Sequence, residues 1–224
     1  MTVIPDEKLI ADLLAKPNAP HLLTTMQQQL EAERKRRLQF YNDITEQQKV
    51  EFINGAIIIH SPVKKAHNDA GKMLLTLLNP YIIKNKLGFL GYEKIMIALT
   101  RNDYEPDLCF FNQQKAQHFK ADQSLFPAPD FIVEVLSKST EANDRGIKFS
   151  DYEAHNVMEY WLIHPTKKYV EQYILSESGE YELKLKASEG NIESLAVKGF
   201  KIPIASIFNE TINMQILEEI IKIV

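Results

Sequence analysis

Residues 129–152 read PDFIVEVLSKSTEANDRGIKFSDY, and this stretch decides which fold class the chain predicts. The run FIVEVL at 131–136 is apolar without alternation, which is typical of a strand buried on both faces of a sheet. A carboxylate, Glu134, interrupts it between two valines. Because a buried carboxylate is costly unless it is paired, protonated or bound to a cation, either the strand is half exposed or Glu134 has a positive partner.

The segment that follows the strand changes to a helical pattern. Ser137, Ser139 and Thr140 are cap-type residues, and a polar, helix-compatible stretch follows them to about residue 156. Within it Lys148, Tyr152 and His155 are spaced at i, i+4 and i+7, so they share one helix face. The pattern therefore predicts a lysine that approaches the sheet from a neighbouring helix.

The rest of the body alternates strand and helix signals. Asn54 and Gly55 separate two β-rich runs and predict a hairpin. A helix with one apolar face follows at 66–85, where Pro80 is expected to kink or end it. This order predicts an α/β fold with a mixed sheet flanked by helices. Further strands are predicted at 89–99, 106–111, 131–136, 158–163, 169–175, 181–187 and 192–197, the last ones adding antiparallel strands at the C-terminal side.

The N-terminal part of the chain has a different composition. Helices are predicted at 5–16 and 25–43, and the second is rich in charge but has a thin apolar face. Its basic run at 34–37 is more typical of a solvated helix surface than of a phosphate-binding site. We therefore divide the chain into a helical arm at 1–44 and a body domain at 45–224.

Bulk composition limits the classes of function. The chain has 224 residues, 45% of them hydrophobic, and a net charge of −4, so it can bury a core but has no overall basic field that would attract nucleic acid. Its one cysteine, Cys109, excludes an internal disulfide and a cysteine-built zinc site. The sequence has neither a membrane-span pattern nor a basic-then-apolar start, so a cytoplasmic protein is expected, with no membrane partner.

Two acids and a lysine are the candidate chemical groups. Asp107 follows a proline at the start of one predicted strand, Glu134 lies on another, and Lys148 lies on the next helix. Carboxylates suit hard divalent cations such as Mg²⁺ or Mn²⁺, and a nearby ammonium can orient an attacking water. Acids paired with a lysine are also common structural features, so spacing alone leaves both interpretations open.

The ordered motifs YEPDLCFF at 104–111 and PDFIVEVLSKSTEANDRGIKFSDYEAHNVMEYWLIHP at 129–165 resemble the Uma-type family of putative restriction endonucleases, a branch of the PD-(D/E)XK nuclease superfamily. The likeness extends back through EFINGAIIIHSPVKKAHN at 51–68 and covers roughly residues 45–175. It implies that the body domain has a restriction-endonuclease-like core, with the arm and the C-terminal strands outside the resemblance.

By position, the resemblance implies that Asp107 and Glu134 hold the metal, that the carbonyl of Val135 is a further ligand, and that Lys148 is the catalytic lysine. The chain departs from the plain superfamily signature at one point, because Leu136 stands where that signature has a lysine. Lys138, in the following loop, is a competing candidate.

Three other residues are weaker candidates. His67 matches a histidine typical of the family and is expected either to face the metal pocket or to be a satisfied core or helix-start histidine. Glu51 and Glu93 lie in strand patterns, where an acid on the exposed face of an edge strand is commoner than a metal ligand. Tyr160 and Trp161 suit base stacking, but core positions are the commoner case.

The function implied by the resemblance is metal-dependent hydrolysis of DNA phosphodiester bonds. Cleavage of both strands requires two sites, so a homodimer is expected. The alternative is a catalytically inactive nucleic-acid or protein interaction module on the same fold, which the acidic balance of the chain favours. The resemblance gives no recognition sequence and no preference among forms of DNA or RNA.

Overall fold

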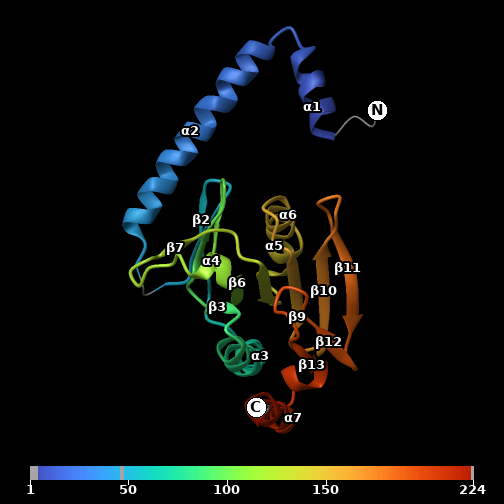
Figure 1. Ribbon diagram of the computed structural model, residues 1–224. Helices are drawn as coiled ribbons and strands as arrows, with labels where there is room; N and C mark the ends of the chain where they lie inside the picture. Colours follow the sequence, from blue (N-terminus) through green and yellow to red (C-terminus); the bar gives the residue numbers. More distant parts are fainter. Residues whose placement is uncertain (1–4, 46–47, 223–224) are drawn as a thin grey trace.

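The structure is a computed structural model that describes residues 5–45 and 48–222 (Figure 1). Helices cover a six-stranded sheet, and a smaller five-stranded sheet lies beside it. The N-terminal half of the chain contains α1 (Pro5–Leu14), α2 (Ala19–Asp43), β1 (Val50–Ile53), β2 (Ala56–Ile59), α3 (Lys65–Asn85), β3 (Gly88–Tyr92), β4 (Met96–Ala98), β5 (Asp103–Tyr104) and β6 (Leu108–Asn112). The second half contains α4 (Gln113–Ala116), β7 (Leu125–Phe126), β8 (Phe131–Val135), α5 (Glu141–Arg145), α6 (Ile147–Ala154), β9 (Glu159–His164), β10 (Tyr169–Leu175), β11 (Tyr181–Ala187), β12 (Asn191–Glu193), β13 (Lys201–Pro203), a 3₁₀ turn (Ile204–Ile207) and α7 (Glu210–Lys222).

The six-stranded sheet has the order β11-β10-β9-β8-β6-β3, and it is mixed because β8 pairs parallel with β9 and antiparallel with β6. The mixed sheet flanked by helices is the predicted fold class. Strand β8 is buried along its whole length, as the lack of alternation in its sequence indicates. The side chain of Glu134 is therefore almost fully enclosed, at 3% exposure, which leaves the second of the two alternatives: a positive partner.

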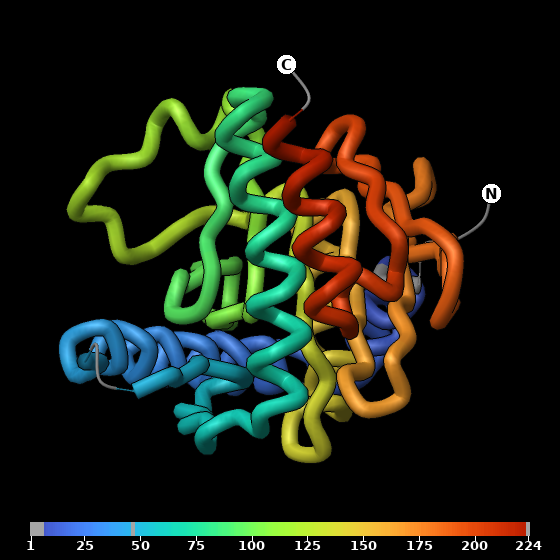
Figure 2. The backbone as a smooth tube through the Cα atoms, turned by 90° about the horizontal axis from the view of Figure 1, so that it is seen from below, coloured from blue at the N-terminus to red at the C-terminus, as the bar shows by residue number. Residues whose placement is uncertain are grey.

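Helices cover the two faces of this sheet unequally. On one face α3 and α7 lie side by side across the strands (Figures 1 and 2), and they pack on side chains of β6, β8 and β9 such as Phe110, Val133 and Trp161. On the other face α6 packs on side chains that alternate with these, among them Ile132 and Tyr160. Tyr160 and Trp161 are both completely buried, so they are core residues and not an exposed stacking platform.

The smaller sheet has the order β2-β1-β5-β4-β7 and begins with the predicted hairpin. Asn54 and Gly55 turn the chain with φ values of 49° and 80°, which both residue types tolerate. The expectation of one strand at 89–99 is wrong: β3 and β4 belong to different sheets. Glu93 and Lys94 separate them in the left-handed region, with φ of 39° and 43°.

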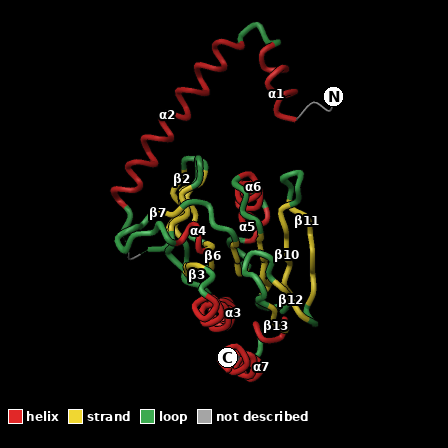
Figure 3. Tube along the Cα trace, viewed as in Figure 1, coloured by secondary structure: helices red, strands yellow, loops and turns green. Residues whose placement is uncertain are grey.

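Two helices differ from expectation. Helix α3 continues through Pro80 to Asn85, so the proline does not end it. Helix α7 was not predicted, although Asn209 caps its start by accepting from the N–H of Ile212. The secondary structure is drawn in Figure 3, where the helices of the arm stand apart from the strands of the body. Across residues 5–45 and 48–222, no helix has the length and apolarity that crossing a membrane requires.

Glu159, at the start of β9, is fully buried and fastens the C-terminal segment to the sheet. One carboxylate oxygen accepts two hydrogen bonds and the other accepts three, at distances of 2.6 to 2.9 Å. The donors are Trp161 Nε1, Gln172 Nε2, Ser194 Oγ, and the backbone N–H groups of Leu195 and Ala196. The dipoles of these five donor groups thus stabilise the buried negative charge of Glu159.

Replacing Glu159 by alanine is expected to destabilise the protein by about 3–5 kcal/mol, because five donors, three of them in buried hydrogen bonds, lose their acceptor. Urea unfolding at neutral pH measures this loss. The matched control is Glu182→Ala on β11, an exposed glutamate whose loss is expected to change the free energy of unfolding by less than about 0.5 kcal/mol. A Glu159→Ala protein as stable as this control would contradict the interpretation.

Candidate active site

The two acids meet on neighbouring strands. Because Leu108 of β6 pairs with Val133 of β8 in an antiparallel register, Asp107, one residue earlier, lies opposite Glu134, one residue later. Side chains at opposed positions of an antiparallel pair point to the same face of the sheet. This is the face covered by α6. The residues that the spacing singled out therefore converge at one end of the β6–β8 pair.

Lys148 reaches Glu134 from helix α6. Its Nζ lies 2.9 Å from Glu134 Oε1, and Tyr152, one turn further along the helix, donates its hydroxyl to the same oxygen at 3.1 Å. Both helix residues are buried, with Lys148 at 2% and Tyr152 at 0% exposure. The i, i+4 spacing predicted this approach. The third residue of that face, His155, lies elsewhere, because its ring accepts from the backbone N–H of Thr100.

Lys148 is surrounded by three acids. Besides Glu134, its Nζ lies 2.8 Å from Glu51 Oε1 and 3.4 Å from Asp144 Oδ1, and that oxygen of Asp144 makes no hydrogen bond. Burial alone would lower the pKa of the ammonium, but the three carboxylates outweigh it and raise the pKa well above its ordinary value. Lys148 is therefore a permanent cation that holds the strands and helices of the site together.

Glu134 and Glu51 differ in how far positive neighbours offset their negative charge. Burial raises the pKa of Glu134 to about 8, with the charges of Asp144 and Asp107 adding to the effect and Lys148 opposing it. Burial also tends to raise the pKa of Glu51, but Lys148 and His60 outweigh burial and lower this pKa to about 2. Glu51 is held better because His60 Nε2 lies 3.0 Å from its Oε2. Glu134 is thus the less compensated of these two acids, and a further cation would favour its ionised form.

Asp107 has side-chain neighbours on both oxygens. Lys49 Nζ lies 2.9 Å from Oδ1, His67 Nε2 lies 3.2 Å from Oδ2, and the backbone N–H of Val135 donates to Oδ2 at 2.8 Å. Burial opposes ionisation, yet these neighbours lower the pKa of Asp107 below its usual range. His67 therefore faces the acid pocket, which was one of its two interpretations.

The other candidates lie farther out. Lys138 is exposed in the loop after β8, so the lysine beside Glu134 is Lys148. The side chain of Glu93 is exposed on the left-handed turn, and only its backbone N–H approaches the site, donating to the carbonyl of Asp107. Asp130 serves the turn before β8, since it accepts from the N–H of Asn112. Glu51, by contrast, is completely buried within the site, not on an exposed strand face.

Sequence reasoning missed Lys49, His60 and Asp144. Asp144 had a usable signal, because it lies four residues before Lys148 on the same helical face. Lys49 and Glu51 alternate along the first strand, which places them on one face, but the strand pattern does not show that this face meets β8. His60 lies just past the hairpin, and no local pattern marks it.

The donor set suits a hard cation with few protein ligands. Among the described residues, no group of three or more His, Cys, Asp and Glu side chains is arranged to hold a metal ion. Mg²⁺, however, needs only one or two carboxylates, since water and substrate oxygens complete its shell. Asp107 and Glu134 supply that number. The raised pKa of Glu134 and the unbonded Asp144 oxygen both indicate acids that the cations of the chain do not fully compensate, which favours an additional cation.

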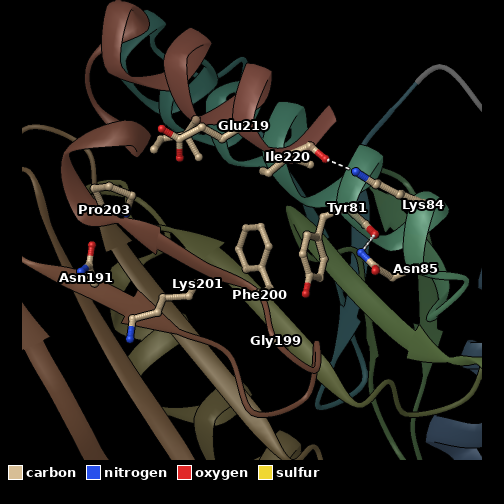
Figure 4. A pocket seen from close by; sticks show the side chains of 11 residues that line it. Tyr81, Lys84, Asn85, Asn191, Gly199, Phe200, Lys201, Pro203, Glu219 and Ile220 are labelled. Carbon is tan, nitrogen blue, oxygen red and sulfur yellow. Dashed lines mark hydrogen bonds between the residues drawn. The ribbon is translucent and has the colours of Figure 1, made fainter. Parts of the chain in front are cut away.

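A separate cavity lies elsewhere in the molecule. It encloses about 530 Å³ between the C-terminal half of α3, the β12–β13 hairpin and α7 (Figure 4). Two of its polar side chains already have partners: Lys84 donates to the carbonyl of Ile220, and Tyr81 donates to the carbonyl of Lys198. We therefore place the chemistry at the acid cluster and not in this cavity.

Comparison with known proteins agrees with this fold. A protein of Synechocystis sp. (strain ATCC 27184 / PCC 6803 / Kazusa), named uncharacterized protein slr1290, is 29% identical over 171 residues, which are 74% of this chain and 81% of that protein. A crystal structure from Anabaena variabilis ATCC 29413, described as a putative nuclease belonging to DUF820, superposes with a TM-score of 0.65. It covers 75% of this chain and 94% of its own at 17% identity, so this likeness concerns the fold.

The family comparison covers both acids and the lysine. The model of the Uma2 family, described as putative restriction endonuclease, matches residues 34–205. This range includes β1, β6, β8 and α6, which together carry the acid cluster, and it begins within helix α2. The chain therefore belongs to the Uma2 family of putative restriction endonucleases.

Proposed function

We propose that the protein is a divalent-metal-dependent endonuclease that hydrolyses phosphodiester bonds in DNA. The observation that carries the proposal is the opposition of Asp107 and Glu134 on β6 and β8, with Lys148 2.9 Å from Glu134. Family membership supports the same class of activity. Restriction-endonuclease-like proteins as a class use divalent metals, and the two carboxylates would hold Mg²⁺ or Mn²⁺ here, with the carbonyl of Val135 as a candidate further ligand.

When bound, the cation supplies Lewis-acid chemistry by stabilising negative charge on the scissile phosphate and by lowering the pKa of water. The residues of the chain hold this arrangement rigid. Lys148 fixes the carboxylate of Glu134, and Tyr152 fixes it from the same helix turn. Lys49 and His67 lie beside Asp107, where they are placed to contact an incoming phosphate. Preorganised charges of this kind stabilise a transition state without having to reorient.

A nuclease panel tests the proposal. Purified protein is incubated with labelled duplex, branched and single-stranded DNA and with RNA, each with Mg²⁺, with Mn²⁺ and with EDTA. We expect cleavage of at least one DNA form that requires the metal. Because both strands of a duplex need a site, the expected species is a homodimer. Metal-independent cleavage, or no cleavage of any form, contradicts the proposed mechanism.

The inactive interaction module remains the second candidate. One observation favours it: Asp107 is already satisfied by Lys49, His67 and the Val135 N–H, so the pocket is stable without a metal. DNA binding without metal-dependent cleavage, and without metal binding at the two acids, is the outcome expected for such a module.

Mn²⁺ is expected to raise the melting temperature of the protein, and more at pH 8 than at pH 5. A ligand at about 100 times its dissociation constant contributes about 2.7 kcal/mol, or roughly 5–10 °C for a chain of this size. The pKa of Glu134 is about 8, well above the ordinary 4.5, so at pH 5 its carboxyl is protonated and protons compete with the metal for its oxygens. Differential scanning fluorimetry at the two pH values measures the shift.

The sign of this dependence is fixed by the pKa shift. In the absence of metal, the folded protein binds a proton at Glu134 that the unfolded chain releases between about pH 4.5 and 8, so stability from this group falls as the pH rises through that range. Metal binding works against that loss. A Mn²⁺ shift that is larger at pH 5 than at pH 8 would show that the metal binds elsewhere.

A further inference from the structure

Helix α2 is docked to the body along only half of its length. Its C-terminal half is fastened by two ion pairs: Glu33 with Arg101 at 2.6 Å and Arg37 with Asp103 at 2.6 Å. Phe40 is buried between them and the small sheet. The N-terminal half and α1 stand clear of the body (Figure 1).

The docked face continues along the free half of the helix. Its residues recur at alternating spacings of three and four, which is the spacing of a helix seam that packs on another element. Glu33, Arg37 and Phe40 make up the docked part. Leu23, Met26 and Leu30 continue the same seam, and we call these three residues the arm stripe. They are 58%, 49% and 52% exposed.

Charge distribution separates the two halves further. Residues 19–30, APHLLTTMQQQL, contain no Asp, Glu, Lys or Arg, whereas residues 31–37, EAERKRR, contain six. Loss of charge around exposed apolar side chains is typical of the centre of a protein–protein interface. Below the stripe, where α2 leaves the body, a hollow of about 440 Å³ is lined in part by Met26 and Leu30. Helix α1 does not cover the stripe and exposes Leu9, Ile10 and Leu14.

We propose that the arm stripe is a dimerisation surface, and that the element covering it is the arm stripe of a second copy of this chain. Three observations support a second copy as the occupant. The stripe continues an interface that the helix already makes, its spacing suits helix–helix packing, and its lack of charge means that two copies meet without repulsion. The stripe precedes residue 34, so it lies outside the residues that the family model matches.

The proposal is independent of the acid cluster, because none of its residues takes part in that site. It states how two copies associate, whether or not they cleave DNA. With Met26 at the middle of the stripe, a two-fold axis through this region brings the two Met26 side chains together. The two bodies then lie on opposite sides of the paired arms.

The experiment uses the full chain and measures its mass by size-exclusion chromatography with light scattering over a range of concentrations. We expect a species of twice the chain mass. The double variant Met26→Glu, Leu30→Glu is expected to raise the dimer dissociation constant at least about 100-fold. Since both residues are exposed, the melting temperature of the monomer serves as the check on folding. The matched control is Leu38→Glu on the same helix, 55% exposed and outside the stripe, which should leave the dimer intact.

Cross-linking locates the contact. The native Cys109 is buried, so a Met26→Cys variant carries one accessible thiol. Under mild oxidation we expect it to form a disulfide-linked dimer, and we expect a Leu38→Cys variant to stay monomeric in denaturing gels. The proposal is overturned if the wild-type chain is monomeric at every concentration. It is also overturned if the dimer survives the double glutamate substitution, because a different surface then holds it.

Discussion

Glu134→Gln is expected to reduce metal-dependent DNA cleavage by at least about 1000-fold while leaving the protein folded and as stable as before. Glutamine has nearly the shape of glutamate, and its side-chain oxygen can still accept from Lys148 Nζ and from the Tyr152 hydroxyl. What it lacks is the negative charge that a divalent cation requires. The substitution is therefore expected to lower the cleavage rate and the affinity for the metal.

Stability without metal distinguishes this role from a purely structural one. Burial already raises the pKa of Glu134 to about 8, so the wild-type group is largely protonated at pH 7, and a neutral amide in its place should cost little. Cleavage rate, Mn²⁺ affinity by calorimetry and melting temperature in EDTA are the three measurements, with exposed Glu182→Gln as the matched control. Destabilisation by several kcal/mol with Mn²⁺ binding intact would falsify the assignment, because Glu134 would then be an ion-pair partner of Lys148 only.

Lys148→Met is expected to have the opposite profile, with destabilisation of about 3–5 kcal/mol at neutral pH together with loss of activity. Methionine has a similar length but removes the cation that Glu51, Glu134 and Asp144 share. For a chain of this size the loss corresponds to roughly 6–20 °C in melting temperature. The penalty should shrink at pH 5, where protonation of the acids relieves their repulsion.

Two comparisons sharpen this test. Lys138→Met changes an exposed lysine and is expected to leave both stability and activity unchanged, which also decides between the two lysines that the sequence offered. Adding Glu51→Gln to Lys148→Met removes the acid that Lys148 keeps ionised, so the double variant should regain part of the lost stability, and a double-mutant cycle measures that coupling. A Lys148→Met protein as stable as wild type would contradict the charge balance described for the site.

The elements that sequence reasoning identified are those with a local chemical signal. Asn54 and Gly55 marked a hairpin through their tolerance of positive φ, and the largely apolar, non-alternating run of β8 indicated a central strand. The i, i+4 spacing of Lys148 and Tyr152 predicted how the lysine approaches Glu134. In each case a short stretch of sequence carries the physical constraint.

The elements that sequence reasoning missed depend on contacts between distant segments. The break between β3 and β4 falls at Glu93 and Lys94, which are not typical left-handed residues, so no glycine or asparagine marks it. The place of Lys49 beside Asp107 results from the meeting of two sheets, and side-chain alternation along one strand does not show that meeting. Helix α7 was different, since Asn209 and the spacing of Ile216 and Ile220 were available signals.

The position of Lys148 between acids of both sheets has an evolutionary consequence. Glu51 comes from the small sheet and Glu134 from the large one, so the same ammonium serves the proposed chemistry and holds two layers of the protein together. Relatives that had lost cleavage would still be under selection to keep Lys148 and its acids for stability. His67 lies beside Asp107, which Lys49 and the Val135 N–H also hold, so His67 is under a weaker structural constraint than Lys148. In a lineage that had lost catalysis, His67 is therefore expected to be substituted before Lys148.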